Sequence, residues 1–443
     1  MRTVSAGMLM CTWAATLSLH AAPPRVVEAF PDTADRVDPT TTELRIIFDQ
    51  DMQPGGRSIC GGGDTFPTIS GAPRWLDART FVLPITLQAD KAYVLSVNCP
   101  AARNFKSVTG EPAEPYAISF ATTKAGEAPP TLAPEQAADM LVRLRRLIDE
   151  RYSHRDLHDI DWPARFEQFR GRLAGAPTPA AFARAAAECL RVNNDLHLTL
   201  EVSGVRLATG RRAVAPNYNA RTLATIVPNY TPSRTGARGV FDTPSRDGRI
   251  GYIAIHTWNA DASTQALADL RALGDITGLV VDVRLNSGGD EAAARAFATR
   301  FVEGPTVYSR SLIRSPDASG GWDGPFERTV EPAPDATPFG HRVAILIGPA
   351  CMSSNESFVL MMRRPGQREL FGARTWGSSG NPRPHDLGHA VTVHLPSWRD
   401  LAPDGSEVEG RGIEPDHAVP WPSPPPADRD PVLDAALAWL RDH

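Results

Sequence analysis

The chain has 443 residues, of which 42% are hydrophobic and 22% charged, with a formal net charge of -5. This length suits two or three domains, and the composition is that of a globular protein rather than a disordered or fibrous one. The small negative charge gives no indication of a nucleic-acid partner or of an anionic membrane surface.

The first 22 residues have the pattern of a secretory leader. Arg2 precedes an apolar stretch from Val4 to Leu19, and Leu19-His20-Ala21 comes before Ala22. The stretch is too short to span a membrane, and no later run reaches spanning length. We therefore expect residues 1–22 to be a signal peptide and the protein to be periplasmic or secreted. Cleavage is favoured over lipid attachment at Cys11, which lies too near the start to leave a full apolar region.

Residues 24–123 alternate short apolar runs with turn residues, and this spacing predicts an antiparallel β-sandwich. The runs are Glu43–Phe48, Thr80–Leu83, Tyr93–Val97 and Tyr116–Phe120. Cys60 and Cys99 fall in this segment and could form a disulfide in an oxidising compartment. We interpret Cys189 and Cys351, further along the chain, as buried free thiols.

A linker and a helical subdomain are expected next. Residues 124–134 are rich in Pro, Ala and Gly, which is typical of a linker. Residues 135–195 carry apolar side chains at helical spacing, and Thr178-Pro179 marks a helix start. The two apolar stripes consist of Met140, Leu141, Leu144, Leu147 and Ile148, and of Phe182, Ala185, Ala186 and Leu190.

Residues 196–443 are expected to form an α/β core with a carboxy-terminal helix, Pro431–Leu440. Strands around Leu198–Val202 and Ile250–Ile255 precede two strand–turn–helix units. The first unit has the strand Gly278–Arg284, the turn Asn286–Gly289 and the helix Glu291–Val302, and the second has the strand Val343–Ile347 and a helix after Ser353. Apolar strands followed by helices predict a parallel sheet, with ligands at the carboxyl ends of its strands.

Ser353 follows a buried-strand pattern and a tight turn. Its structural interpretation is a capping box, in which Ser353 and Glu356 satisfy the first amides of the helix. Its functional interpretation is a nucleophile at a helix amino terminus, beside free amides that stabilise an oxyanion. Such a serine needs a base, usually histidine or lysine. Because lysine occurs only at Lys91, Lys106 and Lys124, the sequence predicts a histidine-assisted serine.

Two further segments could complete such a site. The turn containing Gly288 either needs glycine for unusual backbone angles or places an amide donor close to a substrate carbonyl. His197, at a helix-to-strand junction, is either a satisfied surface residue or a base. A nucleophile at Cys351 is disfavoured because this residue precedes the helix by two positions.

No metal site or cofactor is expected. His385, Asp386 and His389 are close in sequence, but their Pro- and Gly-rich setting favours a loop over a helical pair of ligands.

From about Glu135 to its end, the chain resembles the carboxy-terminal-processing and tricorn-core family of serine peptidases. Four segments carry the resemblance in order. Asp195–Thr199 is similar to its Asp-Gly-His-Thr element, and Val281–Gly289 to its Asp-x-Arg-x-Asn-x-Gly-Gly signature. Ser353–Glu356 is similar to its Ser-Ala-x-Glu segment, and Glu407–Asp416 to its Glu-Gly-x-Gly-Val-x-Pro-Asp element. Residues 24–123 also resemble a bacterial immunoglobulin-like domain, through Pro31-Asp32, Ile47–Met52 and Phe120–Thr123.

The resemblance implies a multidomain fold: an all-β immunoglobulin-like sandwich, a small helical layer and a crotonase-like α/β core. It assigns the nucleophile to Ser353, the base to His197 and a supporting carboxylate to Glu409. It further implies that backbone amides of the oxyanion site come from Gly288, Gly289 and Ser354.

One position relates the chain to a branch of this family, and two others depart from the family's pattern. Ser378 stands where the serine-lysine branch has its lysine, so the chain resembles the tricorn-like, serine-histidine branch. Leu196 stands where the tricorn arrangement has a serine before its histidine, and Asn355 is bulkier than usual. The relay from Glu409 to His197 is therefore direct, mediated by water, or absent. Val202–Gly251 shows no convincing PDZ module.

The sequence thus predicts an exported serine peptidase that acts on a peptide or protein through an acyl-enzyme. Its alternative is an inactive peptidase-fold protein with a binding or scaffolding role, which Leu196 favours. A purely structural surface protein would explain residues 24–123 alone.

Overall fold

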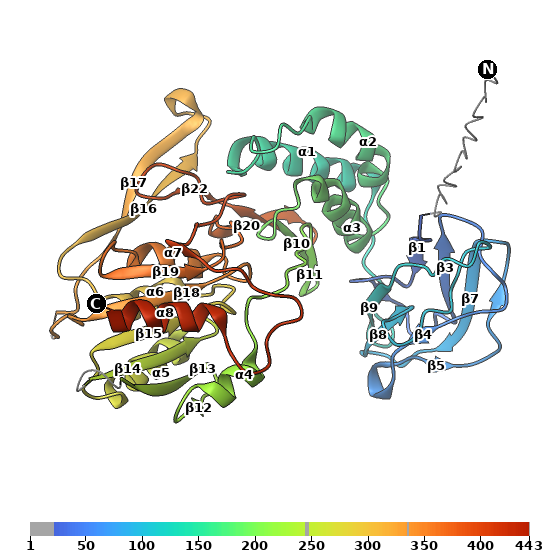
Figure 1. Ribbon diagram of the computed structural model, residues 1–443. Coiled ribbons are helices and arrows are strands. Elements are labelled where there is room, and N and C mark those ends of the chain that lie inside the picture. The colour runs from blue at the N-terminus through green and yellow to red at the C-terminus, as the bar shows by residue number, and fades with distance from the viewer. Residues whose placement is uncertain (1–21, 244–247, 335, 443) are drawn as a thin grey trace, which may run out of the picture. The chain divides into compact units, whose positions relative to one another are not determined.

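The computed structural model describes residues 22–243, 248–334 and 336–442 (Figure 1). The chain divides into two compact units, Met1–Thr131 and Leu132–His443. Each unit has its own hydrophobic core. The predicted leader falls almost entirely outside the described residues.

The first unit consists of two β-sheets. One has the order β1 (Val26–Phe30), β3 (Glu43–Phe48), β7 (Thr80–Thr86), β5 (Thr68–Ile69), with β6 (Arg74–Trp75) also on β7. The other has the order β2 (Arg36–Val37), β9 (Tyr116–Thr122), β8 (Ala92–Val97), β4 (Ile59–Cys60). The predicted strands are confirmed. Alternate side chains of both sheets, such as Phe48 and Phe120, meet in one apolar cluster, as the period of two requires.

The cysteines are arranged as the sequence suggested. Cys60, on β4, and Cys99, after β8, form a disulfide. Cys189 and Cys351 are free and buried. A short 3-10 helix, η1 (Gly63–Thr65), lies within the first unit.

Three helices open the second unit: α1 (Pro134–Arg151), α2 (Trp162–Ala174) and α3 (Pro179–Leu190). The side chains of Asp161 and Thr178 accept amide hydrogens and cap α2 and α3, as their residue types favour. The predicted stripes are buried except at Leu147, which is half-buried; Met140, Leu144 and Phe182 are at most 1% exposed. A 3-10 turn, η2 (Arg191–Asn193), leads from α3 to the segment carrying His197.

A seven-stranded sheet forms the centre of the second unit. Its order is β12 (Thr231–Pro232), β13 (Gly236–Thr243), β14 (Gly248–Ile255), β15 (Gly278–Asp282), β18 (Arg342–Ile347), β19 (Arg368–Gly372), β23 (His417–Ala418). From β14 to β23 neighbouring strands are parallel, which confirms the predicted parallel sheet. The turns that contain Gly288 and Ser353 follow the carboxyl ends of β15 and β18, respectively.

Helices cover both faces of this sheet. On one face α5 (Ala260–Ala272), α6 (Glu291–Ala298) and α7 (Ser354–Met362) meet Val281 and Ile345. On the other face α4 (Ala220–Ile226) and α8 (Pro431–Asp442) meet Val280 and Leu346, and Figure 1 shows α8 running across the sheet. Burial on both faces explains why these strands are continuously apolar. Helix α6 ends at Ala298, four residues before the predicted end.

Two smaller sheets complete the second unit. One has the order β11 (Val205–Ala208), β10 (Thr199–Val202), β21 (Val391–Pro396), β20 (Pro382–Gly388). The other consists of β17 (Trp322–Val330), β16 (Thr306–Arg314) and β22 (Trp398–Leu401), with η3 (Ser319–Gly321) between β16 and β17. The loop predicted for His385 and Asp386 is wrong, because both lie on β20, which pairs with β21. Within the described residues, every helix is too short or too polar to cross a lipid bilayer.

Candidate active site

Ser353 lies between β18 and α7 in an uncommon backbone conformation. Its φ is 59° and its ψ is -136°, a region that non-glycine residues rarely adopt and that is found at functional sites. Its amide donates to the carbonyl of Ser378 at 2.7 Å and to the carboxylate of Glu356 at 3.1 Å. Glu356 therefore binds the amide as a capping residue would, while the backbone of Ser353 is shaped as a sharp turn.

His197 faces this serine. Its Nε2 lies 3.1 Å from Ser353 Oγ, although 156 positions separate the two residues in the chain. The amide of His197 donates to Asp195 Oδ1 at 2.8 Å. Burial, aided by the charge of His154 and opposed by that of Asp195, lowers the pKa of His197. The imidazole is therefore neutral near pH 7, as a general base must be.

Ser378 contacts the other nitrogen of the same ring. Its Oγ lies 3.0 Å from His197 Nδ1, and the residue is buried. When Nδ1 carries the hydrogen and donates it to Ser378, the lone pair of Nε2 is free to face Ser353. In the sequence, Ser378 stands out only because it takes the place of a lysine. A hydroxyl at this position, in place of an amine, can form a hydrogen bond with a histidine.

Glu409 does not hold His197 directly. In the described part of the chain, the carboxylate bonds instead to the amide of Ser379, at 2.6 Å, and Oε1 lies 3.9 Å from His154 Nδ1. Burial raises the pKa of Glu409 to about 8. Ser378 thus contacts the ring nitrogen that Glu409 was expected to serve, and Glu409 binds the residue after Ser378.

Glu356 binds the backbone of the loop that contains Ser378. Its fully buried carboxylate accepts four hydrogen bonds: from the Ser353 amide at 3.1 Å, the Thr375 hydroxyl at 2.5 Å, the Gly377 amide at 2.8 Å and the Ser378 amide at 2.9 Å. Burial raises its pKa to about 7, although these donors act in the opposite direction. One side chain therefore links the turn that carries Ser353 to the loop that carries Ser378.

The glycine turn lies against Ser353. A Cβ on Gly288 would lie 2.7 Å from Ser353 Cβ and 3.1 Å from the Ser354 nitrogen, and Gly288 has a φ of 104°. The residue must be glycine, because a side chain would fill the space beside the hydroxyl. This space is where the oxygen of an attacked carbonyl would have to be accommodated.

The amides around this space differ in availability. The Gly288 amide already donates to Asn286 Oδ1 at 2.8 Å. The amides of Gly289 and Ser354 have no acceptor among the described residues. Ser354 Oγ donates to the Gly289 carbonyl at 2.6 Å, which fixes the glycine turn against the start of α7.

Two other residues singled out from the sequence have structural contacts. Asn355 is buried, and its side-chain amide donates to the carbonyls of Val283 and Asn286 at 3.2 and 3.1 Å. These hydrogen bonds hold the glycine turn in place. The Cys351 thiol donates to the Val283 carbonyl at 3.1 Å, and burial raises its pKa to about 12. A thiol so rarely ionised is a poor nucleophile.

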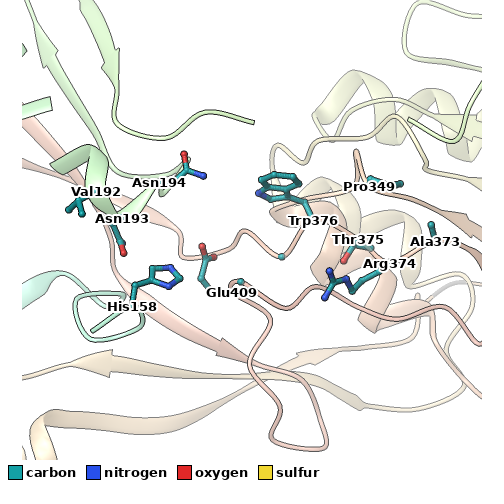
Figure 2. A pocket seen from close by; sticks show the side chains of 12 residues that line it. His158, Val192, Asn193, Asn194, Pro349, Ala373, Arg374, Thr375, Trp376 and Glu409 are labelled. Carbon is teal, nitrogen blue, oxygen red and sulfur yellow. The ribbon is translucent and has the colours of Figure 1, made fainter. Parts of the chain in front are cut away.

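A cavity of about 710 Å³ adjoins these elements. Its walls include Asn194, Trp376 and Gly377, which neighbour the site in sequence, as well as His158 and Glu409. In the view of Figure 2, Glu409 lies between His158 and Trp376. The volume is within the range of sites that hold a small ligand or part of a peptide.

Comparison with known proteins relates part of the second unit to a known family. Residues 249–419 match the model of Peptidase family S41. The chain carries a peptidase family S41 domain. The matched segment of this S41 domain contains Gly288, Ser353, Ser378 and Glu409, whereas His197 precedes it.

Named relatives agree with the assignment. The chain is 30% identical over 196 residues to the tricorn protease homolog 1 of Streptomyces coelicolor, which covers 43% of this chain and 17% of that protein. It is 24% identical over 175 residues to the carboxy-terminal processing protease CtpB of Bacillus subtilis, covering 39% of this chain and 34% of that protein. The chain thus spans about a third or less of these curated relatives.

The fold is also shared with a solved structure. A proposed peptidase from Parabacteroides merdae superimposes with a TM-score of 0.57 at 21% identity, and the match covers 70% of this chain and 97% of that one. This likeness shows the fold, and the arrangement around Ser353 carries the functional argument.

Proposed function

We propose that this protein is a serine peptidase in which His197 deprotonates Ser353 and the serine attacks a peptide carbonyl. The observation that carries the proposal is the 3.1 Å contact between Ser353 Oγ and His197 Nε2. It has the length expected for a nucleophile and its base. The 3.0 Å contact from Ser378 to Nδ1 supports it, because a third group that orients the base is the usual companion of such a pair.

The steps follow from the positions of the groups. Ser353 Oγ bonds to the carbonyl carbon while its proton passes to Nε2 of His197. The amides of Gly289 and Ser354 stabilise the negative oxygen, and Ser378 accepts the hydrogen bond from the imidazolium. The imidazolium protonates the leaving amine, and water then hydrolyses the acyl-enzyme with His197 again as base. Gly288, assigned as a donor from the sequence, acts instead by leaving room for the oxygen.

An inactive protein with a binding role is the weaker alternative. This alternative was favoured because Leu196 stands where the tricorn arrangement has a serine. Ser378 offers the histidine a hydroxyl from another part of the chain. The uncommon φ of Ser353 also favours activity, since strain of this kind persists where function requires it.

Export and an immunoglobulin-like first unit belong to the same proposal. The disulfide between Cys60 and Cys99 supports export, because such bonds persist outside the reducing cytoplasm. We assign the first unit a docking or spacing role and the second unit a crotonase-like core.

Hydrolysis of a complex peptide mixture, followed by mass spectrometry, tests the activity on many candidate substrates at once. The wild-type protein should produce new peptide termini, and Ser353→Ala should produce none while unfolding at the same temperature. New termini at equal yield from the folded Ser353→Ala variant would reject the proposal.

A further inference from the structure

His154 has no place in the mechanism so far, yet it lies between the buried side chain of Asp195 and the half-buried side chain of Glu409. It follows α1, and its side chain is 1% exposed. Its Nδ1 lies 3.0 Å from Asp195 Oδ2 and 3.9 Å from Glu409 Oε1. The Tyr152 hydroxyl donates to the same Asp195 oxygen at 2.8 Å. The two acids are therefore joined through one imidazole.

Each of these acids binds the backbone of a segment that carries one partner of the hydrogen bond between His197 and Ser378. Asp195 Oδ1 accepts the amide of His197 at 2.8 Å, which fixes the segment that carries the base. Glu409 Oε2 accepts the amide of Ser379 at 2.6 Å, which fixes the segment that carries Ser378. The two segments come from opposite ends of the second unit's sequence, and both depend on carboxylates that His154 connects.

The ring also packs against the Ser378 segment. A Cβ on Gly380 would lie only 3.0 Å from Cε1 of His154, and Gly380 has a φ of 129°. Contacts thus run from His154 through Asp195 to His197, and back through the backbone that follows Ser378. The hydrogen bond between Ser378 and His197 completes a ring of contacts, which we call the His154 circuit.

A positive charge on His154 would stabilise the negative charge of the neighbouring acids. A buried carboxylate such as that of Asp195, next to a second acid, is costly unless a cation accompanies the pair. Burial works against a charge on His154, but Glu409 and Asp195 outweigh it and raise the pKa of His154. Burial would likewise raise the pKa of Asp195, and His154 reverses the shift and lowers it.

The same three side chains could be considered as metal ligands, since their donor atoms lie within 4.8 Å of one another. Hydrogen bonds explain the arrangement without an ion. Both oxygens of Asp195 already accept donors, from His197 on one and from Tyr152 and His154 on the other.

We propose that His154 is a positioning residue that joins the segments carrying His197 and Ser378, and so keeps Ser378 in contact with His197 Nδ1. The inference rests on the proposed function, because it concerns how the base of Ser353 is oriented. His154 touches neither Ser353 nor the space for the substrate carbonyl in the described contacts, so its effect passes through Asp195 and Glu409.

Two substitutions separate its hydrogen bond from its charge. In His154→Asn the side-chain nitrogen lies the same number of bonds from the backbone as Nδ1, so a donor to Asp195 remains and the charge is lost. His154→Phe retains a ring and loses both. His417→Asn is the matched control, because His417 also pairs with a carboxylate, Glu369, outside the circuit.

The readout is the rate of Ser353 labelling by a fluorophosphonate as a function of pH, measured on the full chain, with thermal unfolding recorded for each variant. Labelling of Ser353 in the His154→Phe variant should be about 100-fold slower than in the wild type, the loss typical when a catalytic group is slightly misplaced. His154→Asn should stay within about tenfold of wild type, and His417→Asn should match it.

The pH profile of His154→Asn provides the decisive signature. Labelling requires neutral His197, and the charge of His154 lowers the pKa of His197. The groups facing these rings, Asp195, Tyr152, Glu409 and Ser378, all remain, so loss of that charge should move the acid limb to higher pH. A merely structural residue would change the unfolding temperature and leave the limb in place.

A wild-type labelling rate in folded His154→Phe, or a wild-type acid limb in folded His154→Asn, would overturn the inference. If the wild-type protein itself does not react, the proposed function fails as well. Reaction of the wild type together with unchanged variants would leave the proposed function standing and reject only the role of His154.

Discussion

The hydroxyl of Ser378 lies 3.0 Å from Nδ1 of His197, while Ser353 lies 3.1 Å from Nε2 of the same ring. The imidazole therefore lies between two serines, the proposed nucleophile and its proposed orienting partner. The second serine comes from the loop after β19, which thus supplies a hydroxyl group to the histidine.

Replacement of Ser378 by alanine should lower kcat/KM by roughly 10- to 100-fold, the usual effect of losing a group that orients a functional histidine. Ser378→Thr keeps the hydroxyl and should recover most of the rate. Steady-state kinetics on both variants check this, with the loss expected in kcat. Equal rates for Ser378→Ala and wild type would show that the contact does not orient the base.

Gly288→Ala should cost at least about 100-fold in kcat, comparable to the loss of an oxyanion donor. The new methyl group would lie 2.7 Å from Ser353 Cβ and 3.1 Å from the Ser354 nitrogen. Gly304→Ala is the matched control, because a Cβ there meets nothing within 4 Å. Similar kinetics for the two folded variants would remove Gly288 from the site.

The pH dependence of kcat/KM should show an acid limb below pH 6.5, the ordinary pKa of histidine, because burial lowers the pKa of His197. Activity is present when the imidazole is neutral and is lost as the pH falls through this pKa. The profile is measured with a peptide at concentrations far below KM. A limb clearly above pH 6.5 would mean that another group is the base.

Glu356→Gln should alter how stability depends on pH. Burial raises the pKa of Glu356 from 4.5 to about 7, so the folded protein binds this proton more tightly than the unfolded chain does. Its contribution is full below about pH 4.5 and declines as the pH rises towards about 7. The wild-type unfolding midpoint in denaturant should therefore fall across this window more steeply than that of Glu356→Gln. Parallel curves would contradict the assignment.

The sequence predicted the parts of the site that carry residue-specific motifs. Ser353 follows an apolar strand and precedes a helix, and Gly288 lies in a glycine pair after another strand. Because no lysine follows Lys124, a histidine was the expected base. The parallel sheet brings these turns together, as the order of strands indicated. The pairing of Cys60 with Cys99 was also among the possibilities that the sequence offered.

Other features depend on tertiary contacts that no local pattern reports. Leu196 suggested a missing relay partner, and nothing in the neighbourhood of His197 in the sequence pointed to Ser378. Glu409 was expected near His197, but its carboxylate binds the Ser379 amide. His154 is a lone histidine after an amphipathic helix, and only folding reveals that it lies between two acids. The strand through His385 was missed because Pro382, Pro384 and Gly388 are typical of a loop.

The convergence of Ser353 and His197 is tested most directly by covalent labelling with a fluorophosphonate and mapping of the modified peptide. The account predicts a label on Ser353 in the wild-type protein and a rate reduced by about a thousandfold or more in His197→Ala, the scale for loss of a triad member. A label on another residue, or undiminished labelling of Ser353 in His197→Ala, would contradict it.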